Sequence, residues 1–215
     1  MEYHVKSIPS KRAYPWILKK HYAHRRPSIS YAFGLFSNNT RRLEGICTFG
    51  YPPNYNFNKG KCVFINYEVT TLELNRLVVN DKLPKNTLSY FVSSSLKLLP
   101  KPCCIVSYAD PNQGHHGYIY QATNWIYSGT SSPKHRYIFE DGSSFDIRRG
   151  IDKKGKIVEK ILLQPTYRYF YFLGNKTEVK NMHKHYKLKR LNYPKGDNTK
   201  YDASYEVSEE GLVSC

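Results

Sequence analysis

The sequence predicts a single α/β domain built on a mixed central sheet with helices on its flanks. Two observations carry this prediction. The 215 residues suffice for one full hydrophobic core, and segments that alternate like strands are interleaved with segments of helical spacing. We expect residues 1–191 to form this domain and residues 192–215 to form a polar, flexible tail.

The N-terminal part of the chain predicts a strand, a helix, a β-hairpin and a further strand. Tyr3–Ile8 alternates as a strand does, and Pro9-Ser10 begin a helix that the basic run extends to Pro27. Turn residues at 37–40 separate two β-rich runs, which predicts the hairpin. The hairpin strands, the loop after them and the next strand are expected at Ser30–Phe36, Leu43–Phe49, Tyr51–Lys61 and Thr70–Val79.

The rest of the chain continues the alternation of helices and strands. Thr87–Leu99 has helical spacing, and Cys103–Tyr108 is a short apolar run typical of a buried central strand. A turn-rich segment then leads into a short helix at Tyr118–Trp125. Further strands are expected at Ile126–Ser128, Tyr137–Phe139, Ser144–Ile147 and Arg168–Phe172, with a basic loop at Arg148–Lys160 and either helix or loop at Lys176–Arg190.

The charge of the chain indicates a polyanionic partner. The formal net charge is +16 and the pI is near 9.6. The many tyrosines and phenylalanines are interleaved with Lys and Arg, and aromatic faces can stack on exposed bases while cations hold phosphates. We therefore expect nucleic acid in preference to a membrane or an acidic protein, with ordinary solvated basic faces as the plain alternative.

The cysteines and the hydropathy pattern predict a cytoplasmic protein. The five cysteines are scattered and odd in number, which is typical of reduced thiols. No stretch approaches the apolar length that spans a bilayer, and the first ten residues lack the hydrophobic region of a signal peptide.

Two charged residues stand in the otherwise apolar strand expected at Thr70–Val79. Glu73 and Arg76 point to opposite faces of an ideal strand. An ion pair between them would require a β-bulge, which is a common device beside active sites. A purely structural ion pair explains these charges equally well.

The loop after this strand leads into the helix expected at 87–99. The first amides of a helix have no partner within it, and its dipole favours an anion. A cofactor pyrophosphate would fit this turn, although a Gly-rich signature is absent and Asn86 or Thr87 could simply cap the helix. The candidate cofactor-binding residues are Lys82, Lys85, Asn86, Thr87 and Ser89.

Two further candidates follow the apolar strand at 103–108. Asp110 falls at its carboxyl end, where ligands of open α/β sheets gather, and His116 and Tyr120 share one face of the next helix. A neutral tyrosine can donate to a developing oxyanion or thiolate, and Asp or His can accept a proton from an attacking amine. Taken alone, Asp110 also fits a turn cap and Tyr120 a core aromatic.

Several motifs in combination resemble the Mom proteins of Mu-like phages. The motif at Gly114 is the most specific, the likeness covers roughly residues 15–130, and it fades in the C-terminal third. The order of elements also resembles a GNAT-type acyltransferase, whose mixed sheet splays open to admit an acyl-CoA. The motifs that carry the likeness are ELNRLVV at Glu73, PKNTLS at Pro84, SYAD at Ser107, GHHGYIYQATNWIYSG at Gly114 and, more loosely, His21-Tyr22, His24-Arg25 and Phe33–Phe36.

The resemblance implies an enzyme that converts adenine N6 in double-stranded DNA to a carbamoylmethyl-type base. Such a modification protects phage DNA from host restriction, which places the protein in the bacterial cytoplasm. The resemblance also implies acetyl-CoA as the donor and iron as a further requirement, while the sequence shows no set of metal ligands. The functional positions of the family fall on His21, Tyr22, Arg76, Ser89, Asp110 and Tyr120.

Each of these residues receives a provisional role. Arg76 and Ser89 would hold cofactor or target groups, and Asp110 with Tyr120 would form the reacting centre. His21 and Tyr22 would approach from the first helix as metal or substrate contacts.

Adenine N6 is base-paired in a duplex, so chemistry on it favours extrusion of the base into an aromatic pocket. The stacking candidates are Tyr108, Tyr118 and Trp125. The candidates for phosphate contacts are Lys19, Lys20, Arg25, Arg26, Arg148, Arg149, Lys153, Lys154, Lys156, Lys184, Lys187, Lys189 and Arg190.

Two other functions compete with DNA modification. An acetyltransferase acting on a small amine or a protein would use the same fold and would need no DNA. A non-catalytic phage DNA-binding protein would account for the charge but not for Arg76, Asp110 and Tyr120 together. The sequence leaves the oligomeric state open, a homodimer included.

Overall fold

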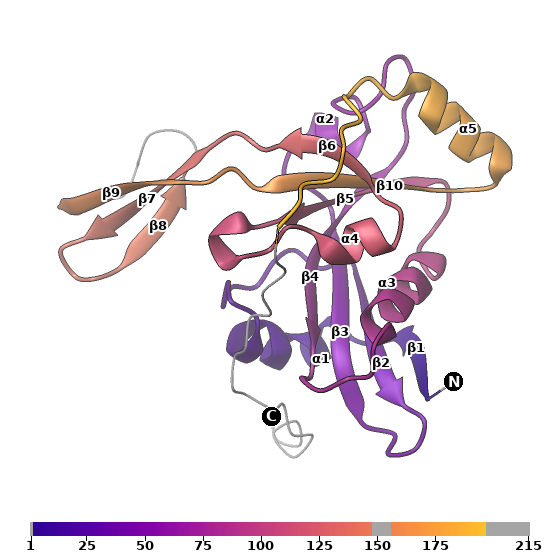
Figure 1. The fold of residues 1–215 in the computed structure, drawn as a ribbon, viewed down its shortest axis with the longest axis horizontal. Coiled ribbons are helices and arrows are strands. Elements are labelled where there is room, and N and C mark those ends of the chain that lie inside the picture. The colour runs from indigo at the N-terminus through magenta and orange to yellow at the C-terminus, as the bar shows by residue number, and fades with distance from the viewer. Residues whose placement is uncertain (1, 148–155, 197–215) are drawn as a thin grey trace.

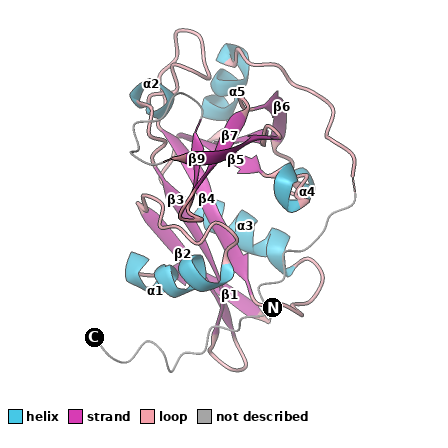
Figure 2. Ribbon diagram, turned by 90° about the vertical axis from the view of Figure 1, so that its left-hand side faces the viewer, coloured by secondary structure: helices cyan, strands magenta, loops and turns pink. Residues whose placement is uncertain are grey.

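The computed structural model of the chain describes residues 2–147 and 156–196. Its centre is a seven-stranded mixed sheet in the order β1-β2-β3-β4-β5-β10-β6, with helices on both faces (Figure 1, Figure 2). The mixed α/β fold expected from the sequence is therefore confirmed. The strands of this sheet are β1 Tyr3–Ser7, β2 Tyr31–Ser37, β3 Leu43–Gly50, β4 Thr71–Val79, β5 Cys103–Ala109, β6 Ile126–Thr130 and β10 Tyr167–Leu173.

The sheet is split between its two central strands. β1 to β4 form an antiparallel half, and β5, β10 and β6 form a second antiparallel half. The parallel pair β4–β5 joins the halves only at Thr71–Glu73, opposite Cys104–Val106. The carboxyl-terminal parts of β4 and β5 are unpaired with each other, so the sheet splays there.

Helices cover both faces of the half formed by β1 to β4. The first is α1 Ser10–Pro15, which continues as a π-helical turn, η1 Trp16–Lys20. Trp16 and Ile17 are buried against Ile46 and Val78 in one core cluster. α3 Thr87–Lys97 is buried on the other face, in the cluster that contains Phe49 and Leu72. The short helices are α2 Tyr55–Asn58, η2 Pro111–Gln113 and α4 Tyr118–Ala122.

The last helix, α5 Lys176–His185, lies at one end of the molecule (Figure 1). Its buried Met182 packs with Phe64 and Phe172 in a third core cluster. In the described part of the chain, no helix is long and apolar enough to cross a lipid bilayer.

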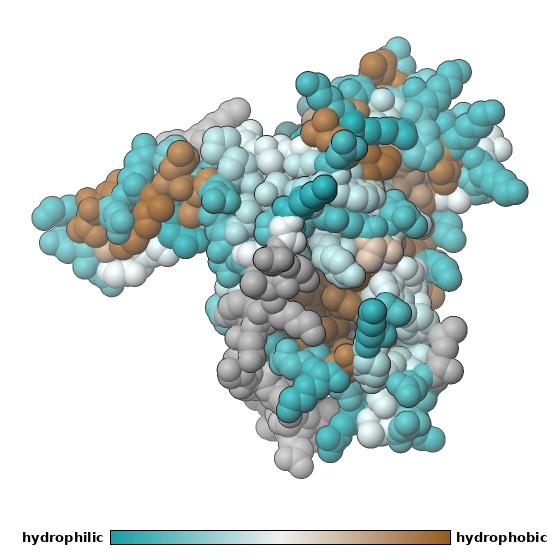
Figure 3. Space-filling model, in the orientation of Figure 1, coloured by the Kyte–Doolittle hydropathy of each residue, from teal (hydrophilic) through white to brown (hydrophobic). Residues whose placement is uncertain are grey.

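A second, three-stranded sheet projects from the body as an arm, at the opposite end from α5 (Figure 1). Its strands are β7 Lys134–Phe139, β8 Ser144–Ile147 and β9 Ile157–Leu163. Figure 3 shows hydrophobic residues along the arm, where Val158 and Leu162 are exposed. At its base, the side chain of Asn112 donates to the backbone oxygen of Gln164 (3.1 Å) and accepts from the Gln164 amide (3.1 Å).

Several elements differ from the expectations. The first helix ends at Lys20 rather than at Pro27, because His21 is extended and His24 has a φ of 42°. Strand β9 occupies part of the segment expected as a basic loop, β6 runs through Gly129, and α5 resolves the helix-or-loop alternative as a helix.

The described beginning of the polar C-terminal segment packs on α4. The Leu191 amide donates to Tyr127 O (3.0 Å), and the Tyr193 hydroxyl donates to Trp125 O (2.7 Å). Gln121 Nε2 donates to Pro194 O (3.3 Å). Residues up to Pro194 are thus held against the domain.

Candidate active site

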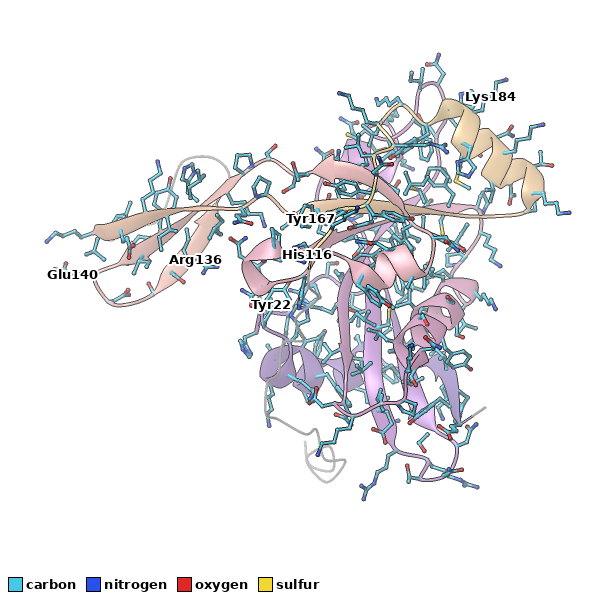
Figure 4. The ribbon with its side chains drawn as sticks, in the orientation of Figure 1. Tyr22, His116, Arg136, Glu140, Tyr167 and Lys184 are labelled. Carbon is cyan, nitrogen blue, oxygen red and sulfur yellow. The ribbon has the colours of Figure 1, made fainter. Side chains whose placement is uncertain are left out.

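A cavity of about 210 Å³ lies where β4 and β5 diverge. It is lined by the unpaired part of β4, the end of β5, the residues after η1, and the loop that leads into α4. Figure 4 labels Tyr22, which follows η1, and His116, which lies in the loop that leads into α4. The lining residues are His21, Tyr22, Leu74, Asn75, Arg76, Leu77, Leu88, Tyr108, Ala109, His115, Gly117, Tyr118, Ile119 and Tyr120.

The π-helical turn determines where His21 and Tyr22 lie. At its end, Lys20 is buried with a side-chain exposure of 4%, and its ammonium contacts Asp81 Oδ2 at 2.6 Å. The chain then turns, so that the His21 and Tyr22 rings stack at 4.3 Å and both line the cavity. π-helical turns often mark functional sites, and this one delivers two predicted site residues.

His21 is a neutral hydrogen-bond donor toward the cavity. Burial, together with the charge of Arg76, lowers the pKa of His21 to about 3. Its Nδ1 accepts a hydrogen bond from the Ala23 amide (3.0 Å), so the ring proton resides on Nε2. Protonation of His21 therefore contributes nothing to the site at neutral pH.

Tyr22 and Tyr120 are neutral hydroxyl groups at neutral pH. Burial is the main cause that raises the pKa of Tyr22 to about 12, with Asp110 contributing, and burial also raises the pKa of Tyr120. The Tyr120 and Ser107 hydroxyl oxygens are 2.7 Å apart, and Ser107 Oγ donates to Leu74 O (2.8 Å). Because Ser107 has a single hydroxyl proton, this arrangement leaves the Tyr120 proton to Ser107.

Arg76 lies beside a β-bulge of β4. The register with β3 passes from Arg76 opposite Thr48 to Leu74 opposite Phe49, so Asn75 is the extra residue. Arg76 donates through NH1 to Asn75 O (2.5 Å) and through NH2 to Arg25 O (3.0 Å). Its Nε is buried without a hydrogen-bond partner, which leaves a donor for a ligand.

Arg76 is the charged residue of the cavity. Burial lowers the pKa of Arg76, but a guanidinium remains protonated at neutral pH. The other ionisable groups in the lining include His21 and His115, and burial lowers the pKa of both. A developing negative charge in the cavity would therefore be stabilised by Arg76 and by neutral hydroxyl and imidazole donors.

Asp110 lies next to the cavity and also caps a turn. Its Oδ1 accepts from the backbone and side-chain nitrogens of Asn112 (3.0 and 2.8 Å). It is half-buried, and its charge adds to the effect of burial in raising the pKa of Tyr22 and opposes the effect of burial in lowering the pKa of His115. Asp110 therefore caps the turn and also lies close to the site.

His115 also lines the cavity, although no role was predicted for it from the sequence. Its ring meets Tyr22 edge-on at 5.6 Å, and its immediate neighbours include Asp110. The signal was present in the doubled histidine of the Gly114 motif, but the helical spacing drew attention to His116 instead. His116 stacks on Tyr167 at 5.8 Å and is not part of the lining.

The residues predicted to hold a cofactor lie around the start of α3, next to the lining residue Leu88. Asn86 is the residue before the helix, has a φ of 70° and makes no side-chain cap. Lys82 and Lys85 are exposed, Thr87 is buried, and Ser89 Oγ donates to Asn86 O (2.9 Å). Ser89 is therefore separate from the cavity lining, whereas the uncapped first turn fits an anionic group.

The predicted DNA contacts divide into four groups, one of which consists of the exposed Lys156, Lys184, Lys187, Lys189 and Arg190 in the C-terminal third. Lys19, Arg25 and Arg26 are exposed and flank the His21–Tyr22 segment. Lys20 is buried beside Asp81, so we leave it out of the DNA surface. Arg148, Arg149, Lys153 and Lys154 lie outside the described residues.

Among the stacking candidates, Tyr108 and Tyr118 line the cavity, while Trp125 is 1% exposed and packs on Tyr120 and Tyr171.

The described residues contain no group of three or more His, Cys, Asp or Glu side chains arranged to hold a metal ion. They therefore offer no set of iron ligands. His21 also does not fit such a role through Nε2. Its Nδ1 receives a backbone proton, whereas a metal-bound imidazole uses its second nitrogen as a donor. Substrate contact is the remaining part of the role assigned to His21.

Asn75 latches the segment that carries His21 and Tyr22. Its Oδ1 accepts from Thr48 Oγ1 (2.6 Å), and its Nδ2 donates to Ser28 O (2.8 Å). We expect Asn75→Ala to destabilise the fold by about 1–2 kcal/mol, because both hydrogen bonds are lost, and to lower turnover about tenfold. Thermal denaturation and single-turnover modification kinetics check this.

The control for Asn75 is Asn39→Ala in the exposed β2–β3 turn, which should leave both measurements unchanged. Asn75→Asp keeps the acceptor for Thr48 but loses the donor for Ser28, so it should be at least as impaired as Asn75→Ala. Wild-type turnover in both Asn75 variants would contradict the latch.

A mixed sheet that splays beside a cavity with one fixed cation and several neutral donors defines an open α/β domain with an internal site. The chain belongs to the Mom protein family, whose family model matches residues 2–195. It is 30% identical over 214 residues to methylcarbamoylase mom of Escherichia phage Mu, an alignment that covers 90% of this chain and 84% of that protein. The resemblance drawn from the sequence motifs is thus confirmed and extends over nearly the whole chain.

Solved structures with a similar arrangement include several acetyltransferases. Ribosomal-protein-S5-alanine acetyltransferase from Vibrio fischeri has a TM-score of 0.48 at 9% identity, over 80% of this chain and 93% of that one. NAA60 from Arabidopsis thaliana, solved with a bisubstrate analogue, has a TM-score of 0.49 at 12% identity, over 79% and 97%. The yncA acetyltransferase from Salmonella typhimurium, solved with its cofactor acetyl-CoA, has a TM-score of 0.46 at 9% identity, over 81% and 96%.

Proposed function

We propose that this chain modifies adenine N6 in double-stranded DNA to a carbamoylmethyl-type base and thereby protects phage DNA from restriction in the bacterial cytoplasm. Membership of the Mom protein family supports the reaction. The observation that carries the proposal to this structure is the cavity in which His21, Tyr22, Arg76 and Tyr120 meet at the split of the sheet.

The cavity suits a base that has left the duplex. Adenine N6 is engaged in pairing within the helix, so access to it requires extrusion of the nucleotide. Tyr22, Tyr108 and Tyr118 supply aromatic faces, and Tyr118 is 62% exposed at the rim. Lys19, Arg25 and Arg26 are exposed beside this entrance and would hold the phosphates on either side of the extruded base.

The donor side of the site would lie at the start of α3. An acyl-CoA, acetyl-CoA in particular, would supply the two carbons of the carbamoylmethyl group when bound, and a separate donor would supply its amide nitrogen. The uncapped first turn of α3 and the exposed Lys82 and Lys85 would receive its phosphates. Leu88 of the same turn lines the cavity, so a bound donor would extend from this turn toward Arg76.

The protonation state of each residue in or beside the cavity suggests its role in the reaction. Arg76, through its unpartnered Nε, would stabilise negative charge that develops on a donor oxygen in the cavity. His21 would donate through Nε2–H, and Tyr120 would hold its orientation through Ser107. Asp110 and His115, adjacent to Tyr22, are the groups available to receive the proton that leaves the attacking amine.

Nucleoside mass spectrometry of plasmid DNA from cells that express the chain tests this function. We expect a fraction of deoxyadenosine to be replaced by a heavier nucleoside, and the plasmid to resist restriction at adenine-containing sites. Cells that express Arg76→Ala at the same level serve as the control. An unchanged deoxyadenosine profile, with acetyl-CoA consumed by a small amine in the absence of DNA, would favour the N-acetyltransferase alternative.

A further inference from the structure

Helix α5 carries three lysines on the face that it turns away from the core. Lys176, Lys180 and Lys184 are exposed and follow one another at intervals of four residues, which places them in one stripe. Val179 and the buried Met182 lie on the opposite side, in the third core cluster. Figure 4 shows Lys184 on the outer side of α5, at the opposite side of the view from Tyr22, the labelled residue that lines the cavity. We call Lys176, Lys180 and Lys184 the lysine ridge.

The ridge has no acidic neighbour on its own helix face. The helix contains one acid, Glu178, which is engaged in a capping box: its Oε2 accepts from the Asn175 amide (2.7 Å), and its own amide donates to Asn175 Oδ1 (2.9 Å). Like charges four residues apart destabilise a helix. The ridge holds two such pairs in succession, a cost that a polyanion bound along it would remove.

The positive charge continues beyond the helix. The segment from Asn175 to Arg190 holds six cations, the ridge with Lys187, Lys189 and Arg190, against the single acid Glu178, so its net charge is 6 − 1 = +5. Lys187 Nζ donates to Lys61 O (2.6 Å), and the Arg190 guanidinium contacts His183 Nδ1 (2.8 Å). These contacts tie the continuation to the body, whereas the ridge side chains extend into solvent.

We propose that the lysine ridge is a second DNA-binding surface, which holds the phosphates of the duplex outside the cavity. The partner follows from charge complementarity with the substrate, so this inference rests on the proposed function. Eight residues of helix separate Lys176 from Lys184, a rise of about 12 Å, which matches three to four phosphates along one DNA strand.

The ridge binds phosphates through side chains alone. The capping box occupies the amides of Asn175 and Glu178 and places the Glu178 carboxylate at the start of α5, which disfavours an anion there. Lysine ammonium groups act as point charges without a base-reading geometry. The ridge therefore contributes affinity that is independent of sequence and sensitive to salt.

A triple variant, Lys176→Gln with Lys180→Gln and Lys184→Gln, isolates the ridge, because glutamine and lysine have nearly equal helix propensities. Affinity of the full chain is measured by fluorescence anisotropy at several salt concentrations, on duplexes of about 40 and about 12 base pairs. The matched control is Lys11→Gln with Lys97→Gln and Lys101→Gln, which removes the same charge from exposed residues elsewhere.

We expect the ridge variant to lose about tenfold or more in affinity for the long duplex, with a salt slope lower by about 2.7, and to bind the short duplex almost as well as wild type. The control should retain the wild-type slope. An unchanged slope in the ridge variant would overturn the inference. Loss of binding to phosphatidylserine vesicles without loss of DNA binding would also overturn it and reassign the ridge to a membrane surface.

Adenine modification by wild-type protein on the long duplex is measured in parallel by nucleoside mass spectrometry. Modification that persists in the ridge variant at low salt, together with its weakened binding, is the expected pattern. If wild-type protein binds DNA through the ridge but modifies no adenine, the proposed function fails and the ridge stands.

Discussion

Arg76→Ala is expected to lower the rate of adenine modification by at least about 100-fold, because it removes the one full positive charge among the residues that line the cavity. The substitution also releases the carbonyl of Arg25, to which NH2 donates, and so loosens the segment that carries Tyr22. Single-turnover kinetics with a fixed excess of enzyme measure the loss directly.

Arg76→Lys separates charge from geometry. A lysine keeps the positive charge but cannot donate to Asn75 O and Arg25 O while also presenting a third donor to the cavity. We expect it to recover little of the lost rate. The control is Arg168→Ala, which removes a half-buried guanidinium that also donates to a backbone carbonyl, Ser128 O, but does not line the cavity. Equal losses in Arg76→Ala and Arg168→Ala would show that the effect is structural.

Gly117→Ala is expected to destabilise the fold by roughly 3 kcal/mol and to abolish activity. Gly117 has a φ of 80°, and a Cβ there would lie within contact distance of the buried Tyr169 ring. Tyr169 OH donates to His116 O (2.5 Å), so displacing the ring also displaces the loop that positions His115. For a chain of this size, the melting temperature should fall by about 6–12 °C.

Gly142→Ala is the matched control for Gly117→Ala. Gly142 has nearly the same φ, 76°, but no atom lies within 4 Å of the position of its Cβ. The difference between the two variants therefore measures the contact with Tyr169 without the strain of the backbone. Equal melting temperatures would mean that Tyr169 yields easily and that the loop is not held by it.

Local patterns predicted the central sheet well, because its strands are short apolar runs bounded by turns. Cys103–Ala109 is almost entirely buried, as its composition indicated, and the hairpin turn falls where Ser37–Thr40 placed it. A bulge is present at Asn75 of β4, which is the irregularity that an ion pair between Glu73 and Arg76 would require. Glu73 and Arg76 alone could not show which residue is the extra one, because that depends on pairing with β3.

The arm was not predictable in the same way. Ile157–Leu163 contains charged residues inside an apolar run and follows a basic segment, so neither strand nor loop dominates locally. It becomes a strand because β7 pairs with it along its length. Such long-range pairing overrides local propensity and leaves little trace in a single sequence.

The structure brings together several of the residues that the sequence proposed for the site, while their roles stay predictions. His21, Tyr22, Arg76 and Tyr120 all reach the cavity. Lys20 was misread because a basic run suggests a solvated face, while the π-helical turn directs this lysine inward to Asp81, 61 positions away. Partners so distant in the chain are invisible to spacing arguments.

The side-chain amide of Asn112 connects the base of the arm to Asp110 of the candidate site through hydrogen bonds. One side chain grips the carboxylate of Asp110 and, through its other contacts, the backbone at Gln164 where the arm is rooted. A displacement of the arm at Gln164 would therefore pull on the Asn112 side chain, while the backbone amide of Asn112 would still hold Asp110. A movement of the arm would in this way reach Asp110, the carboxylate beside Tyr22.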